Sequence, residues 1–163
     1  AYWGIWNKTT IKSYVNKAIF SESSSLVRDA GQALVYTANK QGAKVNQTII
    51  KDIISKVSYV FDEDTHTYLH IVRDILLNKG VSKEARVKLE EWMNNLPYRI
   101  ERCSISEEIK DDIRYYANQI AGIMTIIWPD WTGLNAWQTY IGKEHIKNDV
   151  RNGFEIGVSL ANS

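Results

Sequence analysis

Two histidines and one aspartate recur at four-residue intervals in the middle of the chain. His66, His70 and Asp74 would share one face of a helix, because residues four apart lie about one turn apart. Two imidazoles at this spacing can bind a divalent metal, and a carboxylate one turn further on is a suitable third ligand. The acidic run at 62–64 could instead stabilise protonated histidines without any metal. The spacing favours a solvated polar face, with a metal site and a pH-sensitive surface as alternatives.

The sequence offers little other catalytic chemistry. It contains no P-loop, no G-x-G-x-x-G and no G-x-S-x-G motif. Cys103 is the single cysteine, so no internal disulfide can form, and we expect a small buried hydrophobe at this position. The adjacent carboxylates at 107–108 and 111–112 would point in different directions on a helix. We therefore expect no cofactor and favour a protein that is not an enzyme.

Charge is distributed unevenly along a chain whose net charge is only +1. Residues 1–60 carry eight basic and three acidic side chains, whereas residues 61–163 carry twelve basic and sixteen acidic ones. The basic residues are scattered and form no base-reading helix, which argues against a nucleic-acid partner. A basic N-terminal third is therefore predicted on a mildly acidic body.

Tryptophans gather near the ends of predicted elements. The N-terminal segment 8–20 has a helical apolar stripe, lysines beside it, and tryptophans at its start. Such a helix can be the first helix of a bundle, or can lie on an anionic membrane or a partner. Turn tryptophans can fasten helix ends or form an exposed aromatic patch. The candidate partner or membrane surface comprises Trp3, Trp6, Lys8, Lys12, Lys17, Trp128 and Trp131.

The elements that would position these residues are helices. Apolar residues recur at helical spacing over about 8–20, 26–41, 46–61, 65–78, 83–95, 109–128 and 134–152. A capping box at Ser104–Glu107 would open the longest helix, and Pro129 would end it. Pro97 would end the preceding helix, with a short extended segment after it.

We predict an all-α fold with a single domain over residues 1–163. It would be a bundle of roughly six or seven helices around the long central helix Ile109–Trp128. Phe154, Ile156, Val158 and Leu160 alternate with other residues at strand period. A minor β segment at the C-terminus is therefore part of the expectation.

Three functional hypotheses follow. The first is a non-enzymatic helical interaction module that binds a protein partner through the aromatic and basic surface. The second is a secreted, toxin-like membrane-active protein that engages lipid through its N-terminal amphipathic helix and the 117–137 hairpin. The third is a metal-dependent enzyme that uses His66, His70 and Asp74. A secreted protein is slightly favoured over a cytoplasmic one, and the sequence leaves the oligomeric state open.

Overall fold

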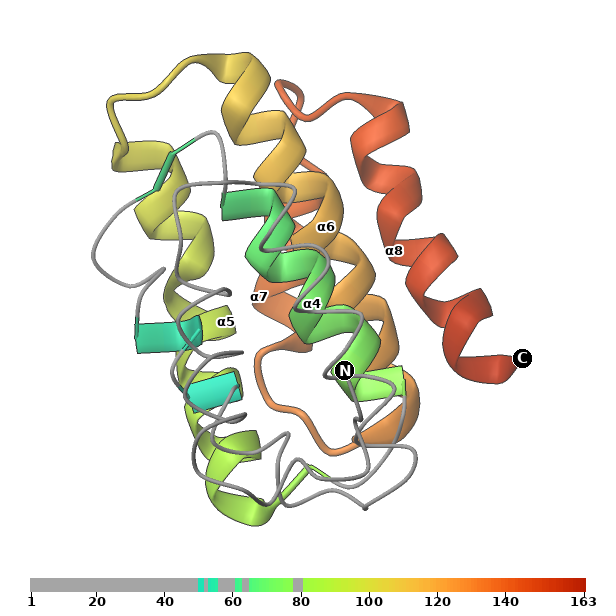
Figure 1. Cartoon of the computed structure of the whole chain (residues 1–163). Coiled ribbons are helices and arrows are strands. Elements are labelled where there is room, and N and C mark those ends of the chain that lie inside the picture. Colours follow the sequence, from blue (N-terminus) through green and yellow to red (C-terminus); the bar gives the residue numbers. More distant parts are fainter. Residues whose placement is uncertain (1–49, 52, 56–60, 63–64, 78–80) are drawn as a thin grey trace, which may run out of the picture.

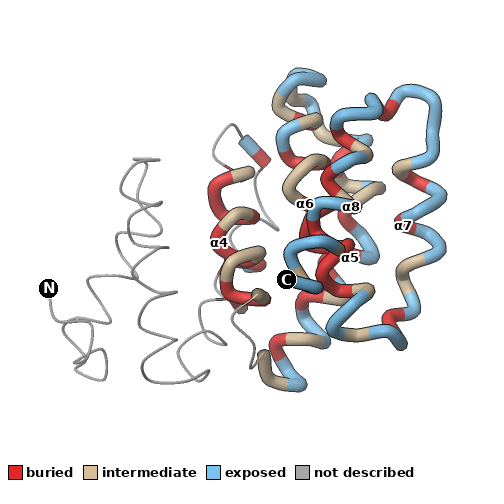
Figure 2. Tube along the Cα trace, turned by 90° about the vertical axis from the view of Figure 1, so that its right-hand side faces the viewer, coloured by how far each residue is buried: buried red, intermediate tan, exposed pale blue. Residues whose placement is uncertain are grey.

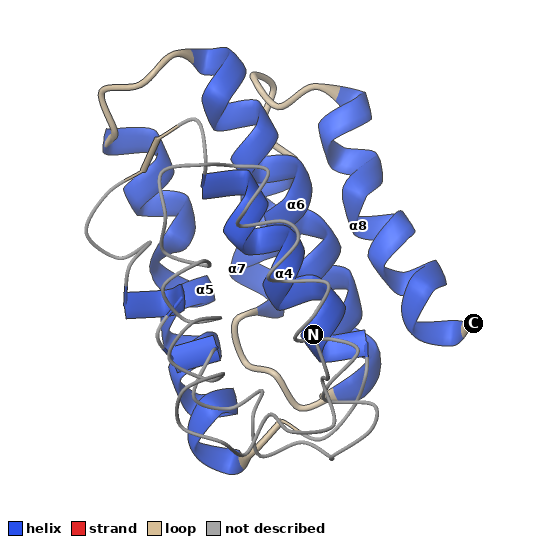
Figure 3. Cartoon of the chain, in the orientation of Figure 1, coloured by secondary structure: helices blue, strands red, loops and turns tan. Residues whose placement is uncertain are grey.

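A computed structural model describes residues 50–51, 53–55, 61–62, 65–77 and 81–163 (Figure 1). Of these residues, 80% are helical and none lies in a strand (Figure 3). The all-α helical bundle is therefore confirmed. The single domain over 1–163 stays a prediction, because residues 1–49 lie outside the described part.

Among the described residues, five helices have defined bounds. They are α4 (Thr65–Leu77), α5 (Lys83–Arg102), α6 (Glu107–Ile127), α7 (Leu134–Ile141) and α8 (Asn148–Asn162). Residues 50–51 and 53–55 are also helical, as the apolar stripe of segment 46–61 predicts. The apolar side chains from Ile50 to Trp137 that face inward share one hydrophobic core.

The long helix α6 is central, and α4, α5, α7 and α8 all pack against it (Figure 1). From Ala117 to Met124 every one of its residues is buried, which agrees with the uncharged stretch of the sequence. The helices around α6 differ in burial. No residue of α4 is exposed, whereas α7 and α8 are exposed over much of their length (Figure 2).

Two expected boundaries are wrong near the start of α6. Pro97 does not end α5, which continues for another turn to Arg102. Pro97 has no N–H donor, so one hydrogen bond of α5 is missing there. The buried Leu96 and Ile100 on either side keep this turn packed against the core. The N-cap of α6 is Ser106, whose hydroxyl accepts from the Ile109 amide at 3.3 Å, in place of Ser104.

The C-terminal part of the chain differs most from expectation. The helix expected over 134–152 is broken at Gly142, which follows α7, and a new helix starts at Asn148. The segment from Phe154 to Leu160 lies within α8, so the β prediction for it is wrong. The alternating pattern arose because Gly153 and Gly157 occupy the buried positions of a helix.

These glycines let α8 approach the backbone of α6. A Cβ at Gly157 would lie 2.1 Å from the Gln119 carbonyl oxygen, and one at Gly153 would lie 2.6 Å from the Tyr115 carbonyl oxygen. Such distances are far shorter than van der Waals contact. The paired residue numbers rise together, so α6 and α8 run parallel, one beside the other (Figure 1).

Buried polar side chains of α6 fix the neighbouring helices. The amide of Asn118 is fully buried; its nitrogen donates to the Val150 carbonyl at 2.8 Å, and its oxygen accepts from the Trp137 indole at 2.9 Å. Gln119 accepts from the Arg73 guanidinium of α4 at 2.7 Å. A single turn of α6 thus binds α4, α7 and α8 through satisfied hydrogen bonds.

The close α6–α8 contact predicts a strong effect of one methyl group. Gly157→Ala should lower the free energy of unfolding by about 2 kcal/mol or more, because the added Cβ meets backbone that cannot move aside. Urea unfolding followed by far-ultraviolet circular dichroism measures this loss.

Gly142→Ala is the matched control, since its Cβ would lie 3.3 Å from the nearest atom and its backbone is right-handed helical. It should change stability by less than about 0.5 kcal/mol. Equal effects of the two substitutions would contradict the close approach of α8.

Candidate functional site

The His66, His70 and Asp74 face lies on α4 as predicted. His70 Nε2 is 3.5 Å from Asp74 Oδ2, and the Arg73 guanidinium contacts the same carboxylate at 3.0 Å. The Tyr116 ring of α6 covers both imidazoles, with ring centroids 5.9 and 5.8 Å away. Among the described residues, no group of three His, Cys, Asp or Glu side chains is arranged to hold a metal ion. The metal site stays a prediction that this geometry does not support.

The two described tryptophans of the predicted surface fasten the turn after α6. Trp131 is 4% exposed, and its indole donates to Asn94 Oδ1 of α5 at 3.1 Å. Trp128 is half-buried under the Arg86 guanidinium, which lies 5.0 Å from the ring centroid and also binds Asp130 at 2.6 Å. These tryptophans thus staple α6 to α5, which is the alternative considered for them. Trp3, Trp6, Lys8, Lys12 and Lys17 lie outside the described residues.

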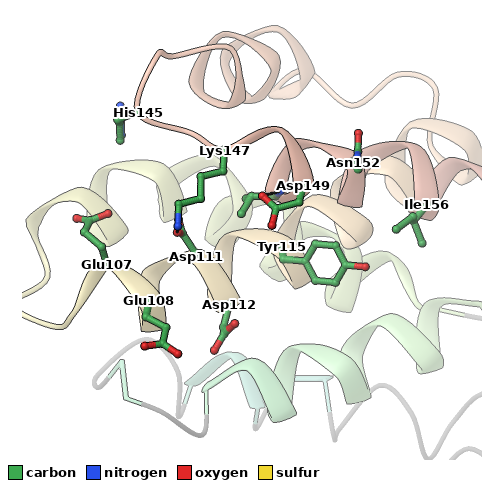
Figure 4. A pocket seen from close by; sticks show the side chains of 11 residues that line it. Glu107, Glu108, Asp111, Asp112, Tyr115, His145, Lys147, Asp149, Asn152 and Ile156 are labelled. Atoms are coloured by element: carbon green, nitrogen blue, oxygen red, sulfur yellow. Dashed lines mark hydrogen bonds and ion pairs between the residues drawn. The ribbon is translucent and has the colours of Figure 1, made fainter.

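A large groove bordered by described residues runs along the N-terminal half of α6, beside α8 (Figure 4). Its volume is about 1050 Å³. Carboxylates dominate its polar lining: Glu107, Glu108, Asp111, Asp112 and Asp149. The apolar lining comes from Tyr115, Val150 and Ile156. We call this the α6/α8 groove.

Behind the groove lies a buried cation, Arg114, which is 1% exposed. Its Nη1 donates to Asp111 Oδ1 at 2.8 Å and to Glu107 Oε2 at 3.0 Å, so two groove carboxylates are bound from within α6. A buried guanidinium is tolerated only where carboxylates and hydrogen-bond acceptors surround it. Arg114 therefore fixes the orientation of Glu107 and Asp111 at the groove.

The same guanidinium joins two other helices. Its Nε donates to the Tyr140 hydroxyl of α7 at 2.8 Å, and its Nη2 donates to Glu101 Oε1 of α5 at 3.2 Å. His145, in the connection between α7 and α8, contacts Glu101 Oε1 through its Nε2 at 2.7 Å. Arg114 and Glu101 thus connect α5, α6, α7 and the loop that leads into α8.

The pKa values follow from this network. Burial alone would raise the pKa of Glu101, but the hydrogen bond with His145 and the charge of Arg114 lower that pKa below its ordinary value. The hydrogen bond from Arg114 likewise lowers the pKa of Glu107. Burial raises the pKa of Tyr140 to about 12, although the bond from Arg114 opposes that rise. At neutral pH the network is a cation held by ionised carboxylates and a neutral phenol.

Not all groove carboxylates are neutralised. Lys147 lies 3.5 Å from Asp111 on the α8 side of the groove (Figure 4). Glu108 and Asp112 point away from α8, and no cation of the described residues pairs with them. A position in the first turn of α6 suits Glu108, because the helix dipole favours acids there. Asp112 lies beyond the first turn, so the helix dipole does not explain why an acidic residue occupies this position.

Sequence reasoning placed this polar stripe on a solvated face and so missed it. Its residues are spaced at i, i+4, i+7 and i+11, namely Glu107, Asp111, Arg114 and Asn118. That is one continuous stripe on a helix, and it ends within the uncharged stretch. A cation flanked by acids on a stripe that runs into an apolar segment is the signal that could have located it.

Comparison with known proteins identifies no relative of this chain. No protein-family model matches the chain, and neither a curated protein nor a solved structure matches it. The class of protein defined by the structure is therefore an all-α bundle with an acidic groove on its central helix.

The buried cation predicts a large loss from one substitution. Arg114→Met should lower the free energy of unfolding at pH 7 by about 3–5 kcal/mol, because Glu101 and Asp111 lose their buried partner. The folded-state pKa values of Glu101 and Glu107 lie below the ordinary 4.5. The two carboxylates therefore contribute fully to the free energy of unfolding above pH 4.5, and this contribution is lost as the pH falls through their folded-state pKa values. Urea unfolding at pH 7, 5 and 3 should therefore show the wild-type advantage shrinking below about pH 4.5.

Arg102→Met is the control, because this arginine is exposed and lies over the Tyr98 ring at the surface. It should cost less than about 1 kcal/mol at every pH. A loss from Arg114→Met no larger than that of the control, or one that does not change with pH, would contradict the network.

Proposed function

We propose that this protein is a non-enzymatic helical interaction module that binds a protein partner in the α6/α8 groove. The observation that carries this proposal is the groove itself, which combines apolar side chains with carboxylates on two closely packed helices. Ile156 is 38% exposed there, although it is a large aliphatic residue in the middle of α8. Apolar contact area with a polar rim is the usual composition of a protein interface.

The chemistry of the groove favours binding over catalysis. Arg114 and Lys147 occupy Asp111 from two sides, and Arg114 binds Glu107. A general acid needs a pKa near the working pH, whereas the pKa of Glu107 is lowered. Cys103 follows α5 outside the groove and is half-buried. These side chains serve to shape a surface.

The partner surface thus differs from the aromatic and basic patch expected from the sequence. Of the described members of that patch, Trp131 is buried and Trp128 is covered by Arg86. Both are engaged within the fold, so neither offers a free aromatic anchor. An acidic groove would also repel the phosphates of a nucleic acid, so we propose a protein as the partner.

The membrane-active alternative has less support from the geometry. Residues 117–137 do form a helical hairpin of α6 and α7, yet its side chains Ile120, Ile123 and Met124 are fully buried in the core. The exposed large aliphatic side chains of this hairpin are Ile126 and Ile127, at 37% and 38%, so lipid would reach only the end of α6. Deeper contact requires the hairpin to leave the core, which costs the burial of its apolar surface. Among the described helices, none has both the length and the apolar composition needed to cross a bilayer.

Site-specific photo-cross-linking tests the proposed interface. A photoreactive phenylalanine analogue at Ile156 should give one discrete protein adduct in an extract of the cells that make this protein, because this position would lie within the interface. Excess unlabelled wild-type protein should remove the adduct, whereas excess Ile156→Asp protein should not.

The same analogue at Val87 is the control, since Val87 is 50% exposed but lies on α5 away from the groove. Equal adducts at both positions, or none at Ile156, would refute the groove as a partner site. A lipid adduct at Ile156 on addition of anionic vesicles would support the membrane-active alternative instead.

A further inference from the structure

The charge of the α6/α8 groove narrows the class of partner. Its lining holds five carboxylates and one lysine, with His145 as the one histidine. Glu107 and Asp111 are bound by Arg114, which leaves Glu108, Asp112 and Asp149 as exposed acids without a paired cation among the described residues. Like charges that lie together at a surface repel each other, and a cationic partner would relieve that repulsion.

The apolar lining lies next to these acids. Glu108, Asp112 and Tyr115 succeed one another along α6 at helical spacing, and Ile156 on α8 lies beyond Tyr115 (Figure 4). The stretch of helix from Glu108 to Tyr115 extends for about 10 Å, or roughly two turns. A partner that lies along the groove would therefore contact acidic side chains at the Glu108 end and apolar side chains at the Ile156 end.

Taken together, we propose that the groove binds an amphipathic helix that carries lysine or arginine residues on the partner protein. Its cations would lie against Glu108 and Asp112, and its apolar stripe would contact Tyr115 and Ile156. This is recognition of a helix in a groove, read through anchors one or two turns apart. The inference rests on the proposed function and adds the chemistry of the partner.

The two kinds of contact have different roles. Exposed ion pairs are individually weak and are screened by salt, so they mainly set the rate and the selectivity of association. The apolar contact with Ile156 and Tyr115 excludes water and slows dissociation. Lys147 already occupies Asp111 at 3.5 Å, so the partner's cations are directed to Glu108 and Asp112 on the side facing away from α8.

The test uses two synthetic helical peptides of 18 residues with the same leucine stripe. One carries four lysines beside the stripe, and its twin carries four glutamines. Fluorescence anisotropy with the full chain should show at least tenfold tighter binding of the lysine peptide in 50 mM salt. That advantage should fall severalfold at 300 mM salt, because the Debye length shortens.

Matched variants locate the charge. Glu108→Gln with Asp112→Asn should weaken lysine-peptide binding at least fivefold. Glu84→Gln with Glu91→Gln removes the same charge from α5, outside the groove, and should leave binding within twofold of wild type. Equal weakening by both pairs would reduce the effect to net charge and overturn the inference, as would equal binding of the two peptides or no binding of either.

The outcomes also separate the two proposals. If Ile156→Asp abolishes binding of both peptides while the peptides bind the wild type equally, the groove accepts helices through apolar contact alone. The interaction module then stands and the basic partner is refuted. If neither peptide binds, the inference falls, and the Ile156 cross-link decides the proposed function independently.

Discussion

The described part of the structure depends on the buried guanidinium of Arg114. Taking a guanidinium out of water is costly, and Arg114 is 1% exposed, so its donors must meet acceptors nearby. Those acceptors come from α5, from the first turns of α6 and from α7, which are thereby fixed relative to one another. The same requirement places Glu107 and Asp111 beside the groove. The need to neutralise a charge inside the bundle thus shapes the surface outside it.

A second constraint acts four residues further along α6. Asn118 binds Trp137 and the Val150 carbonyl, where α8 begins its parallel course beside α6. Gly153 and Gly157 then let the two backbones approach closely. Because α8 packs through its glycines, its larger side chain Ile156 stays on the outside and borders the groove. Close packing and an exposed aliphatic residue therefore have the same cause.

The sequence predicts the parts of the fold that depend on local pattern. Helical spacing located α4, α5 and α6, and Pro129 marked the end of α6. The prediction failed where tertiary contacts determine the local structure. Pro97 stays within α5 because its neighbours are packed against the core. In α8, glycines that alternate with apolar residues resemble the alternating pattern of a strand. The groove was missed because the stripe of α6 that contains Arg114 was assigned to a solvated face. The spacing within α6 signals the stripe, but the acceptors on α5 and α7 that bury Arg114 lie outside that spacing.

Nuclear magnetic resonance of the arginine Nε–H groups at pH 7 and 25 °C tests the central claim most directly. A guanidinium enclosed by Tyr140, Glu101 and Asp111 should give one Nε–H signal that exchanges slowly with water. That signal should show a nuclear Overhauser effect to the Tyr140 ring and disappear in Arg114→Lys. If the Nε–H signal that is lost in Arg114→Lys exchanges with water as fast as the signals of exposed arginines, the Arg114 guanidinium is not enclosed. The explanation given for the bundle and for its groove is then wrong.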